Sequence, residues 1–167
     1  MKKFKLTLVI CLIINITSGQ TLDAYRIYNK NGESVTYNEM AKTLSESSII
    51  LFGELHDNPI AHWLQIELTS TLYENYSKNL VLGAEMFESD NQLIVNEYLS
   101  GTINQKRFEE EARLWPNYKT DYKPLIEFAK ENGLPFIATN IPRRYAAVVS
   151  GGGFEALESL TSEAKSY

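Results

Sequence analysis

The sequence predicts an α/β fold in which a parallel β-sheet is flanked by helices, with a small helical subdomain inserted in one crossover. Two observations support this fold class. Short, continuously apolar runs, which are typical of strands buried on both faces, alternate along the chain with longer segments that carry helix-capping signals. Parallel strands need long connections, and the segments between these runs are long enough to hold helices.

The composition is that of one globular domain, and it narrows the range of partners. Of the 167 residues, 44% are hydrophobic and 22% are charged, which are proportions of a folded domain rather than of a disordered chain. The formal net charge is −5. Because phosphate backbones and anionic lipids repel a negative chain, nucleic acid is not an expected partner.

Residues 1–19 have the layout of a secretory signal peptide, and residues 20–167 are expected to form the exported domain. A lysine-rich start precedes the apolar run Leu6–Ile16, which is shorter than a membrane span, and small residues follow it. Cys11 lies inside this run after bulky residues, so it is not expected to form a lipobox. The predicted location is the periplasm or the outer membrane, and an uncleaved anchor is the alternative.

Local signals define the first elements of the exported domain. Asn31-Gly32 favours a tight turn and predicts a small hairpin. The pattern Thr36-x-x-Glu39 is a capping box that opens a short helix. Asn58-Pro59 supplies an N-cap followed by a proline at the first helical position, which predicts a helix that continues to Tyr76.

Three apolar runs are expected to be the strands of the sheet: Ser48–Phe52, Asn79–Gly83 and Leu134–Ala138. The crossover between the second and third runs is expected to hold three helices. They are Asp90–Leu99 behind a Ser89-x-x-Gln92 box, a helix from the Thr102-x-x-Gln105 box to Leu114, and Asp121–Asn132. A helical tail is predicted from Arg144, with an interruption at three consecutive glycines.

Polar side chains follow each apolar run, and the topology brings them together. The first run is followed by Glu54, His56 and Asp57, the second by Glu85, and the third by Asn140 and Arg143. Because the carboxyl ends of parallel strands share one edge, where open α/β sheets bind ligands, these side chains are expected to line one site. His62, one turn into the following helix, is expected near the same edge. Each residue alone has an ordinary structural explanation, but their convergence favours a function.

This set of residues is compatible with a metal-dependent hydrolase. Imidazole nitrogen and carboxylate oxygen suit a divalent metal such as zinc or manganese. In that function Glu54 or Glu85 would act as general base, His56 would bind the metal or stabilise an oxyanion, and His62 would be a further candidate metal ligand. The sequence has no His-Glu-x-x-His motif, phosphate loop, dinucleotide fingerprint or Gly-x-Ser-x-Gly elbow.

The order and spacing of the motifs between Ser48 and Leu157 resemble those of the ChaN-like haem-binding proteins. This family lies in a wider group with erythromycin esterase and the Tiki metalloproteases. The matching motifs are Gly53-Glu54-Leu55-His56-Asp57-Asn58-Pro59 with His62 and Gln65, Glu85-Met86-Phe87, Trp115 with Tyr118 and Tyr122-Lys-Pro-Leu, and Asn140-x-Pro-Arg143.

The resemblance implies an exported protein that binds ferric haem and serves iron or haem acquisition together with the uptake machinery of the envelope. A tyrosine holds the haem in this family, and a histidine of a second subunit approaches the facing haem of a cofacial pair, which implies a homodimer. The first candidate ligand here is Tyr122 and the second is Tyr118, while His56 and His62 remain open for the histidine. Ferric iron stabilises the phenolate that a tyrosine would otherwise form only near pH 10.

The other parts of such a site are also expected from the resemblance. Arg143, Arg144 or Lys123 would favour the phenolate and pair with haem propionates. Trp115, Phe87, Met86 and Leu125 are candidates for the flat apolar wall. Two departures from the family are visible: Ala61-His62 replaces adjacent histidines, and the chain ends before the usual length of the family, so we expect an incomplete sheet with an open edge.

Overall fold

A computed structural model describes residues 23–167, so the predicted signal peptide and Cys11 lie outside the described residues. The fold class predicted from the sequence is confirmed: a parallel strand pair is flanked by helices, and the connection between its strands holds a helical subdomain. Within the described residues, no helix combines the length and apolar character that a bilayer span needs.

The N-terminal elements form where local signals predicted them. Strands β1 (Ile27–Tyr28) and β2 (Ser34–Val35) make an antiparallel hairpin. Gly32 closes its turn with a φ of 80°, a left-handed conformation that glycine adopts without strain. Helix α1 (Tyr37–Ser45) begins with the complete capping box, because the side chains of Thr36 and Glu39 each bond the backbone N–H of the other.

Helix α2 (Pro59–Tyr76) starts at the predicted cap, where the side-chain oxygen of Asn58 accepts from the backbone N–H groups of Ile60 and Ala61. Its buried face packs on α1 through Ala41, Leu68 and Leu72. The same helix carries His62 inward near its first turn, so the cap also fixes the position of a candidate site residue.

The sheet consists of β3 (Leu82–Glu88) and β4 (Phe136–Asn140), which pair in parallel. Their close approach depends on Gly83, since a Cβ there would lie 2.8 Å from Cγ2 of Thr139 and 3.2 Å from the carbonyl oxygen of Ile137. Both strands begin a few residues later than the sequence predicted. Glu85 is therefore inside a strand rather than beyond its end.

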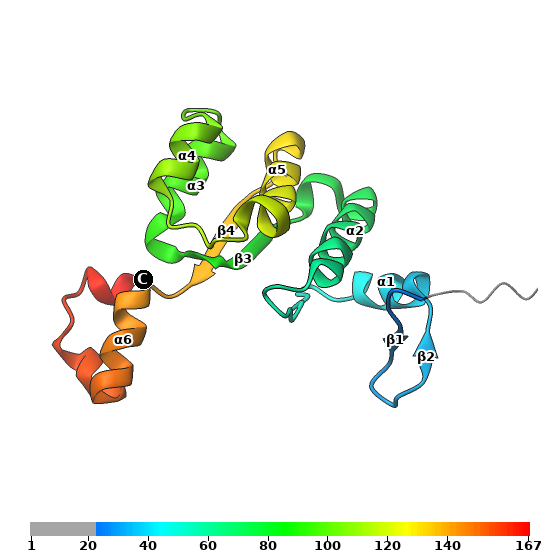
Figure 1. Cartoon of the computed structure of the whole chain (residues 1–167), viewed down its shortest axis with the longest axis horizontal. Helices are drawn as coiled ribbons and strands as arrows, with labels where there is room; N and C mark the ends of the chain where they lie inside the picture. The colour runs from blue at the N-terminus through cyan, green and yellow to red at the C-terminus, as the bar shows by residue number, and fades with distance from the viewer. Residues whose placement is uncertain (1–22) are drawn as a thin grey trace, which may run out of the picture.

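The crossover between β3 and β4 builds the main core. A 3-10 turn, Ser89–Asn91, leads into its helices, which are α3 (Gln92–Leu99), α4 (Gln105–Glu111), a π-helical turn Tyr118–Tyr122, and α5 (Lys123–Asn132). Figure 1 shows α3, α4 and α5 gathered on one side of the strand pair. They enclose a cluster that includes Phe87, Val95, Phe108 and Ile126. Met86 and Phe87 belong to this core, so neither supplies the predicted ligand wall.

The tail forms α6 (Arg143–Gly152) followed by two 3-10 segments, Phe154–Ser159 and Ala164–Ser166. Figure 1 shows α6 at the end of β4, on the side away from α2. Asp90 ties the tail to the crossover, because Arg144 of α6 and Arg113 both pair with its carboxylate.

Two predictions about local structure are wrong. Ser48–Phe52 forms no strand, and its side chains Ile49 and Leu51 are 78% and 92% exposed. Neither predicted capping box in the crossover forms. The Ser89 hydroxyl is buried without a hydrogen bond, and Asn104, rather than Thr102, caps α4 by accepting from Arg107 N–H.

Candidate functional site

The carboxylate of Glu54 is the centre of a polar cluster between the loop before α2, helix α2 itself and the π-helical turn. The hydroxyl of Tyr122 donates to Oε1 of Glu54, and the amide of Gln65 donates to Oε2. Nδ1 of His56 lies 3.3 Å from Oε1, and Nδ1 of His62 lies 3.4 Å from Oε2. One acid thus holds together side chains from three separate segments of the chain.

The surroundings shift the pKa values of Glu54 and Tyr122 in opposite directions. Burial opposes ionisation of Glu54, but the hydrogen bonds from Tyr122, Gln65 and His56, with the charge of His62, outweigh it, and the pKa of Glu54 is lowered. Burial and the bond to Glu54 raise the pKa of Tyr122 well above that of a free phenol, and Asp121 and Glu85 add to this. At neutral pH the pair is therefore a carboxylate with a neutral phenol.

His62 is buried beside this pair in a defined orientation. Its Nε2 lies 3.1 Å from the backbone carbonyl oxygen of His56, which can only accept, so Nε2 carries a proton. Its ring meets the ring of Tyr122 edge-on, with centroids 4.7 Å apart. Its Nδ1 makes no hydrogen bond to the described residues, and it faces the carboxylate of Glu54. A second proton on His62 would therefore lie between the imidazole and Glu54.

The π-helical turn fixes Tyr122 and the loop around His56. Asn117, which precedes the turn, donates from Nδ2 to the carbonyl oxygen of His56 (2.6 Å) and to Oδ2 of Asp121 (2.7 Å). Oδ2 of Asp121 lies 3.9 Å from Nε2 of His62. Single π turns inside helices occur often at functional sites. Here the turn aims Tyr122 at the cluster.

His56 presents the accessible face of the cluster. Its side chain is 58% exposed, and its ring lies edge-on to Trp115 with centroids 4.7 Å apart. Trp115 also contacts Tyr122, with ring centroids 5.4 Å apart. The indole of Trp115 therefore contacts both the exposed imidazole of His56 and the phenol of Tyr122.

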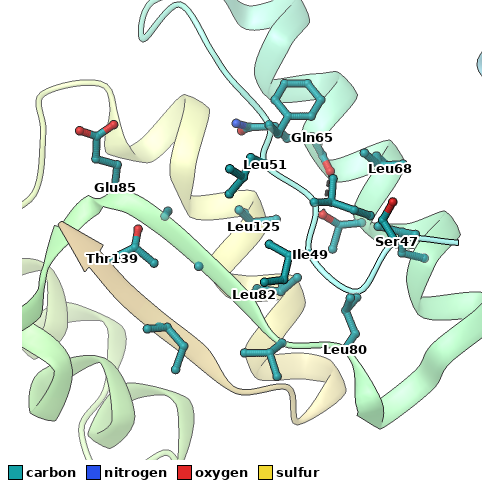
Figure 2. Close-up of a pocket in the computed structure, with 18 of the residues that line it drawn as sticks. Ser47, Ile49, Leu51, Gln65, Leu68, Leu80, Leu82, Glu85, Leu125 and Thr139 are labelled. Atoms are coloured by element: carbon teal, nitrogen blue, oxygen red, sulfur yellow. Dashed lines mark hydrogen bonds between the residues drawn. The ribbon is translucent and has the colours of Figure 1, made fainter. Parts of the chain in front are cut away.

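An open groove of about 1110 Å³ leads to the cluster. One side is formed by the segment from Ser45 to Glu54 and by α2, and the other by β3 with Leu125 and Tyr122. Figure 2 shows Ile49 and Leu51 projecting from the first side toward β3, with Leu125 between the two sides and Glu85 further along β3. The groove is apolar along most of its length and polar where Glu54 and Glu85 line it.

The structure brings some of the predicted site residues together and leaves others apart. Glu54 contacts His56, His62 and Tyr122, and Glu85 lines the same groove without a hydrogen bond to any described residue. Tyr118 is 2% exposed inside the core, where its hydroxyl has no hydrogen-bond partner. Arg143 lies apart, at the start of α6, and its backbone N–H donates to Glu88 (3.0 Å).

The cations predicted to stabilise a phenolate, Lys123 and Arg144, do not contact Tyr122 but pair with other acids. Lys123 bonds Glu109 (3.3 Å), and Arg144 pairs with Asp90. The charged groups around the phenol are instead the acids Glu54, Asp121 and Glu85. Among residues 23–167, no group of three or more histidine, cysteine, aspartate and glutamate side chains is arranged to hold a metal ion.

Two residues of the cluster, Asn117 and Asp121, were not predicted as site residues. Both act through contacts to His56 and His62, which lie far away in sequence. A local sequence pattern cannot predict contacts between residues that are so far apart in the chain. Gln65 was recognised only as part of the family motif, although its position one turn after His62 on the same helix could have indicated it.

The fold and the groove define a parallel α/β protein with a candidate ligand site beside the first half of β3, where Leu82, Gly83, Ala84 and Glu85 line the groove. The family model described as haem-binding uptake, Tiki superfamily, ChaN, matches residues 40–167. The chain belongs to this family.

Two relatives extend the comparison. The structure titled "Cofacial heme binding to ChaN of Campylobacter jejuni" matches with a TM-score of 0.56 at 18% identity, over 73% of this chain and 50% of that chain. Protein RETICULATA-RELATED 5, chloroplastic, of Arabidopsis thaliana is 25% identical over 154 residues, which cover 85% of this chain and 21% of the plant protein. The chain thus spans half of the solved relative and about a fifth of the plant relative.

Proposed function

We propose that this protein binds ferric haem at the polar end of the groove, with Tyr122 as the iron ligand, and that it serves haem or iron handling. The observation that carries the proposal is the Glu54–Tyr122 pair in the wall of a large apolar groove, in a chain of the ChaN family. The Campylobacter relative, whose title names cofacial haem binding, supports the same ligand class.

The donors and the shape of the groove fit such a ligand. A volume of about 1110 Å³ is slightly above the range of about 300–1,000 Å³ that is usual for small-molecule sites. Of the predicted wall, Leu125 lines the groove, whereas Trp115 does not line it but packs on His56 and Tyr122, which do. Tyr122 is favoured over Tyr118 because it lines this groove, whereas Tyr118 is enclosed by the core. His56 is favoured over His62 because its ring is exposed.

Glu54 is positioned to accept the proton that Tyr122 must lose when it binds iron. The hydroxyl proton points to Oε1 of Glu54, and the ionised Glu54 is a ready acceptor for it. Ferric haem would supply a Lewis-acidic iron, which favours an anionic oxygen ligand. Glu54 would then take or relay the proton that Tyr122 gives up, and Gln65 would keep Glu54 in place from its other oxygen.

We also propose that the protein is exported and acts in haem uptake. The signal-like residues 1–19 support export to the periplasm or outer membrane, where the protein would meet haem-uptake machinery. The exposed His56 would approach the facing haem across a homodimer, in keeping with the cofacial pair named for the Campylobacter structure.

Titration of the full chain with haemin tests the ligand assignment. The wild type is expected to give a shifted Soret band with the charge-transfer absorption of ferric tyrosinate. Tyr122→Phe is expected to abolish the tyrosinate absorption, because phenylalanine offers no oxygen to the iron. Tyr28→Phe is the matched control, since Tyr28 lies exposed on the hairpin and should leave the spectrum unchanged.

Three results would contradict the proposal. An unchanged haemin spectrum at micromolar protein would show that the protein does not bind haem. A tyrosinate spectrum that persists in Tyr122→Phe would show that Tyr122 is not the ligand. Loss of that spectrum in Tyr118→Phe alone would transfer the role to Tyr118.

A further inference from the structure

Three tyrosines are buried in the described part of the chain, and they differ in what their hydroxyl groups meet. The hydroxyl of Tyr118 has no hydrogen-bond partner. Tyr98 donates to Glu127, and Tyr122 donates to Glu54. A phenol loses an electron far more readily when a positioned base takes its proton in the same step, because a neutral phenoxyl radical then forms directly. Of the three, Tyr98 and Tyr122 have such a base.

The charges around these two phenols are opposite in sign. The ammonium of Lys130 lies over the ring of Tyr98, 3.6 Å from its centroid. A cation on the face of a ring is attracted by the π electrons, so it opposes the removal of one of them. The charged groups that act on Tyr122 are instead three carboxylates. Negative charge nearby opposes a phenolate but favours the loss of an electron.

The aromatic neighbours of the two phenols also differ. Tyr98 stacks on Phe108, with ring centroids 4.3 Å apart, and a phenyl ring is very hard to oxidise. Tyr122 contacts the indole of Trp115, with ring centroids 5.4 Å apart. Indole is, with phenol, the most easily oxidised aromatic side chain, and rings this close exchange an electron rapidly. Trp115 therefore gives an electron from Tyr122 a way out.

Trp115 also connects the buried phenol to the surface. Tyr122 is 4% exposed, so an oxidant in solution cannot reach its ring. Trp115 is partly exposed, and it lines a second cavity of about 650 Å³ beside α4, outside the groove. An oxidant that meets the indole is therefore one ring away from Tyr122.

We propose that Tyr122 is a redox-active tyrosine, which reduces an oxidised metal complex through Trp115 while its hydroxyl proton moves to Glu54. The oxidant takes one electron from Trp115 and leaves an indole radical cation. An electron from Tyr122 then restores the indole. In the same step the O–H bond of Tyr122 breaks and an O–H bond forms on Oε1 of Glu54. The products are a neutral phenoxyl radical, a neutral carboxylic acid and an oxidant reduced by one electron.

This activity belongs to the haem-free chain. Iron bound at the Tyr122 oxygen would displace the proton that the oxidation step moves, so haem binding and radical formation exclude each other. The carboxylates around Tyr122 oppose its ionisation in the haem-free protein. The same carboxylates attract a positively charged oxidant toward Trp115.

Photo-oxidation of the haem-free full chain tests the proposal. Flash excitation of ruthenium tris-bipyridine with a sacrificial electron acceptor produces a cationic one-electron oxidant, and tyrosyl radicals are followed by transient absorption and electron paramagnetic resonance. We expect a radical that is absent from Tyr122→Phe and that forms more slowly in heavy water, because a proton moves with the electron. Trp115→Phe should remove the same signal. Trp63→Phe, which changes an exposed indole packed on Tyr25, should leave it intact.

Two matched substitutions test the proton acceptor. Glu54→Gln keeps the size of the side chain but cannot take the proton, so formation of the Tyr122 radical should slow by about a hundredfold or more. Glu127→Gln makes the same change beside Tyr98 and should leave the rate unchanged. The comparison of light and heavy water needs no substitution, so it tests the proton transfer even where Glu54→Gln does not fold.

Each part of the proposal has a result that would overturn it. A signal that persists in Tyr122→Phe, or that is lost in Tyr98→Phe, would overturn the assignment to Tyr122. Equal rates in light and heavy water, or in Glu54→Gln and the wild type, would overturn the coupled proton transfer. An equal radical yield in Trp115→Phe would overturn the route. The haemin titration is a separate measurement, so a missing tyrosyl radical leaves the proposed haem site unaffected.

Discussion

Replacement of Phe108 by alanine is expected to lower the free energy of unfolding by about 3–5 kcal/mol, the range for a large aromatic side chain removed from a well-packed core. Phe108 is fully buried. Its ring stacks on Tyr98 with centroids 4.3 Å apart and also meets Phe87 and Tyr118. The cavity would open where α4, α3, β3 and the π-helical turn meet, so the surrounding residues cannot close it without moving several elements.

Urea denaturation of the full chain measures this effect. Phe154→Ala is the control, because Phe154 is an exposed residue of the tail and its loss should change the unfolding free energy by less than about 0.5 kcal/mol. Equal effects of the two substitutions would mean that the crossover helices do not form the core described for them.

Replacement of Glu54 by alanine is expected to lower the free energy of unfolding by about 2–4 kcal/mol. The substitution leaves the buried hydroxyl of Tyr122 and the amide of Gln65 without their acceptor, and each such group costs about 1–3 kcal/mol. Tyr122→Phe should cost less, since Glu54 keeps its bonds from Gln65 and His56. In the double variant the losses should be less than additive, because both single changes remove the same hydrogen bond.

This loss should depend on pH in a definite direction. The pKa of Glu54 is lowered in the folded protein by its hydrogen bonds, which overcome the effect of burial. The carboxylate therefore contributes stability above its unfolded pKa, and this contribution is lost as pH falls through the lower, folded pKa. The difference between the wild type and Glu54→Ala should shrink in acid. Glu74→Ala, at an exposed position of α2, should show neither the loss nor its pH dependence.

Elements whose signals are complete within a few residues were predictable from the sequence. The capping pair Thr36 and Glu39 and the cap Asn58 with Pro59 each contain all the groups that satisfy the helix end, so they form as predicted. Gln92 shows the limit of such signals. It was expected to complete a local box with Ser89, but its side chain instead bonds Phe136 and Ala138 of β4, where a longer-range partner is better placed.

The Ser48–Phe52 run failed as a strand for a different reason. Its composition specifies a preference for an extended, buried conformation, but a strand exists only when a neighbour pairs with it. No described residue pairs with this segment. The sequence of a segment indicates its preferred conformation, but it does not show whether another strand pairs with that segment.

The candidate site was predictable in part. The motif before α2 placed Glu54, His56 and His62 together, and the structure joins all three. The grouping did not require the predicted strand, since the loop and the first turn of α2 already bring these residues close. Tyr122 was singled out by family resemblance, and its bond to Glu54 spans 68 residues. Periodicity and spacing cannot specify a contact of that range, nor the acidic surroundings that raise the pKa of Tyr122.

The position of iron in crystals of the full chain grown with haemin tests the proposed site most directly. Anomalous scattering at the iron edge should give a peak at bonding distance from the Tyr122 oxygen, at the groove end lined by Glu54 and Glu85, with the hydrogen bond between Tyr122 and Glu54 broken or reversed. An iron peak elsewhere on the molecule, with Tyr122 still donating to Glu54, would contradict the proposed haem site.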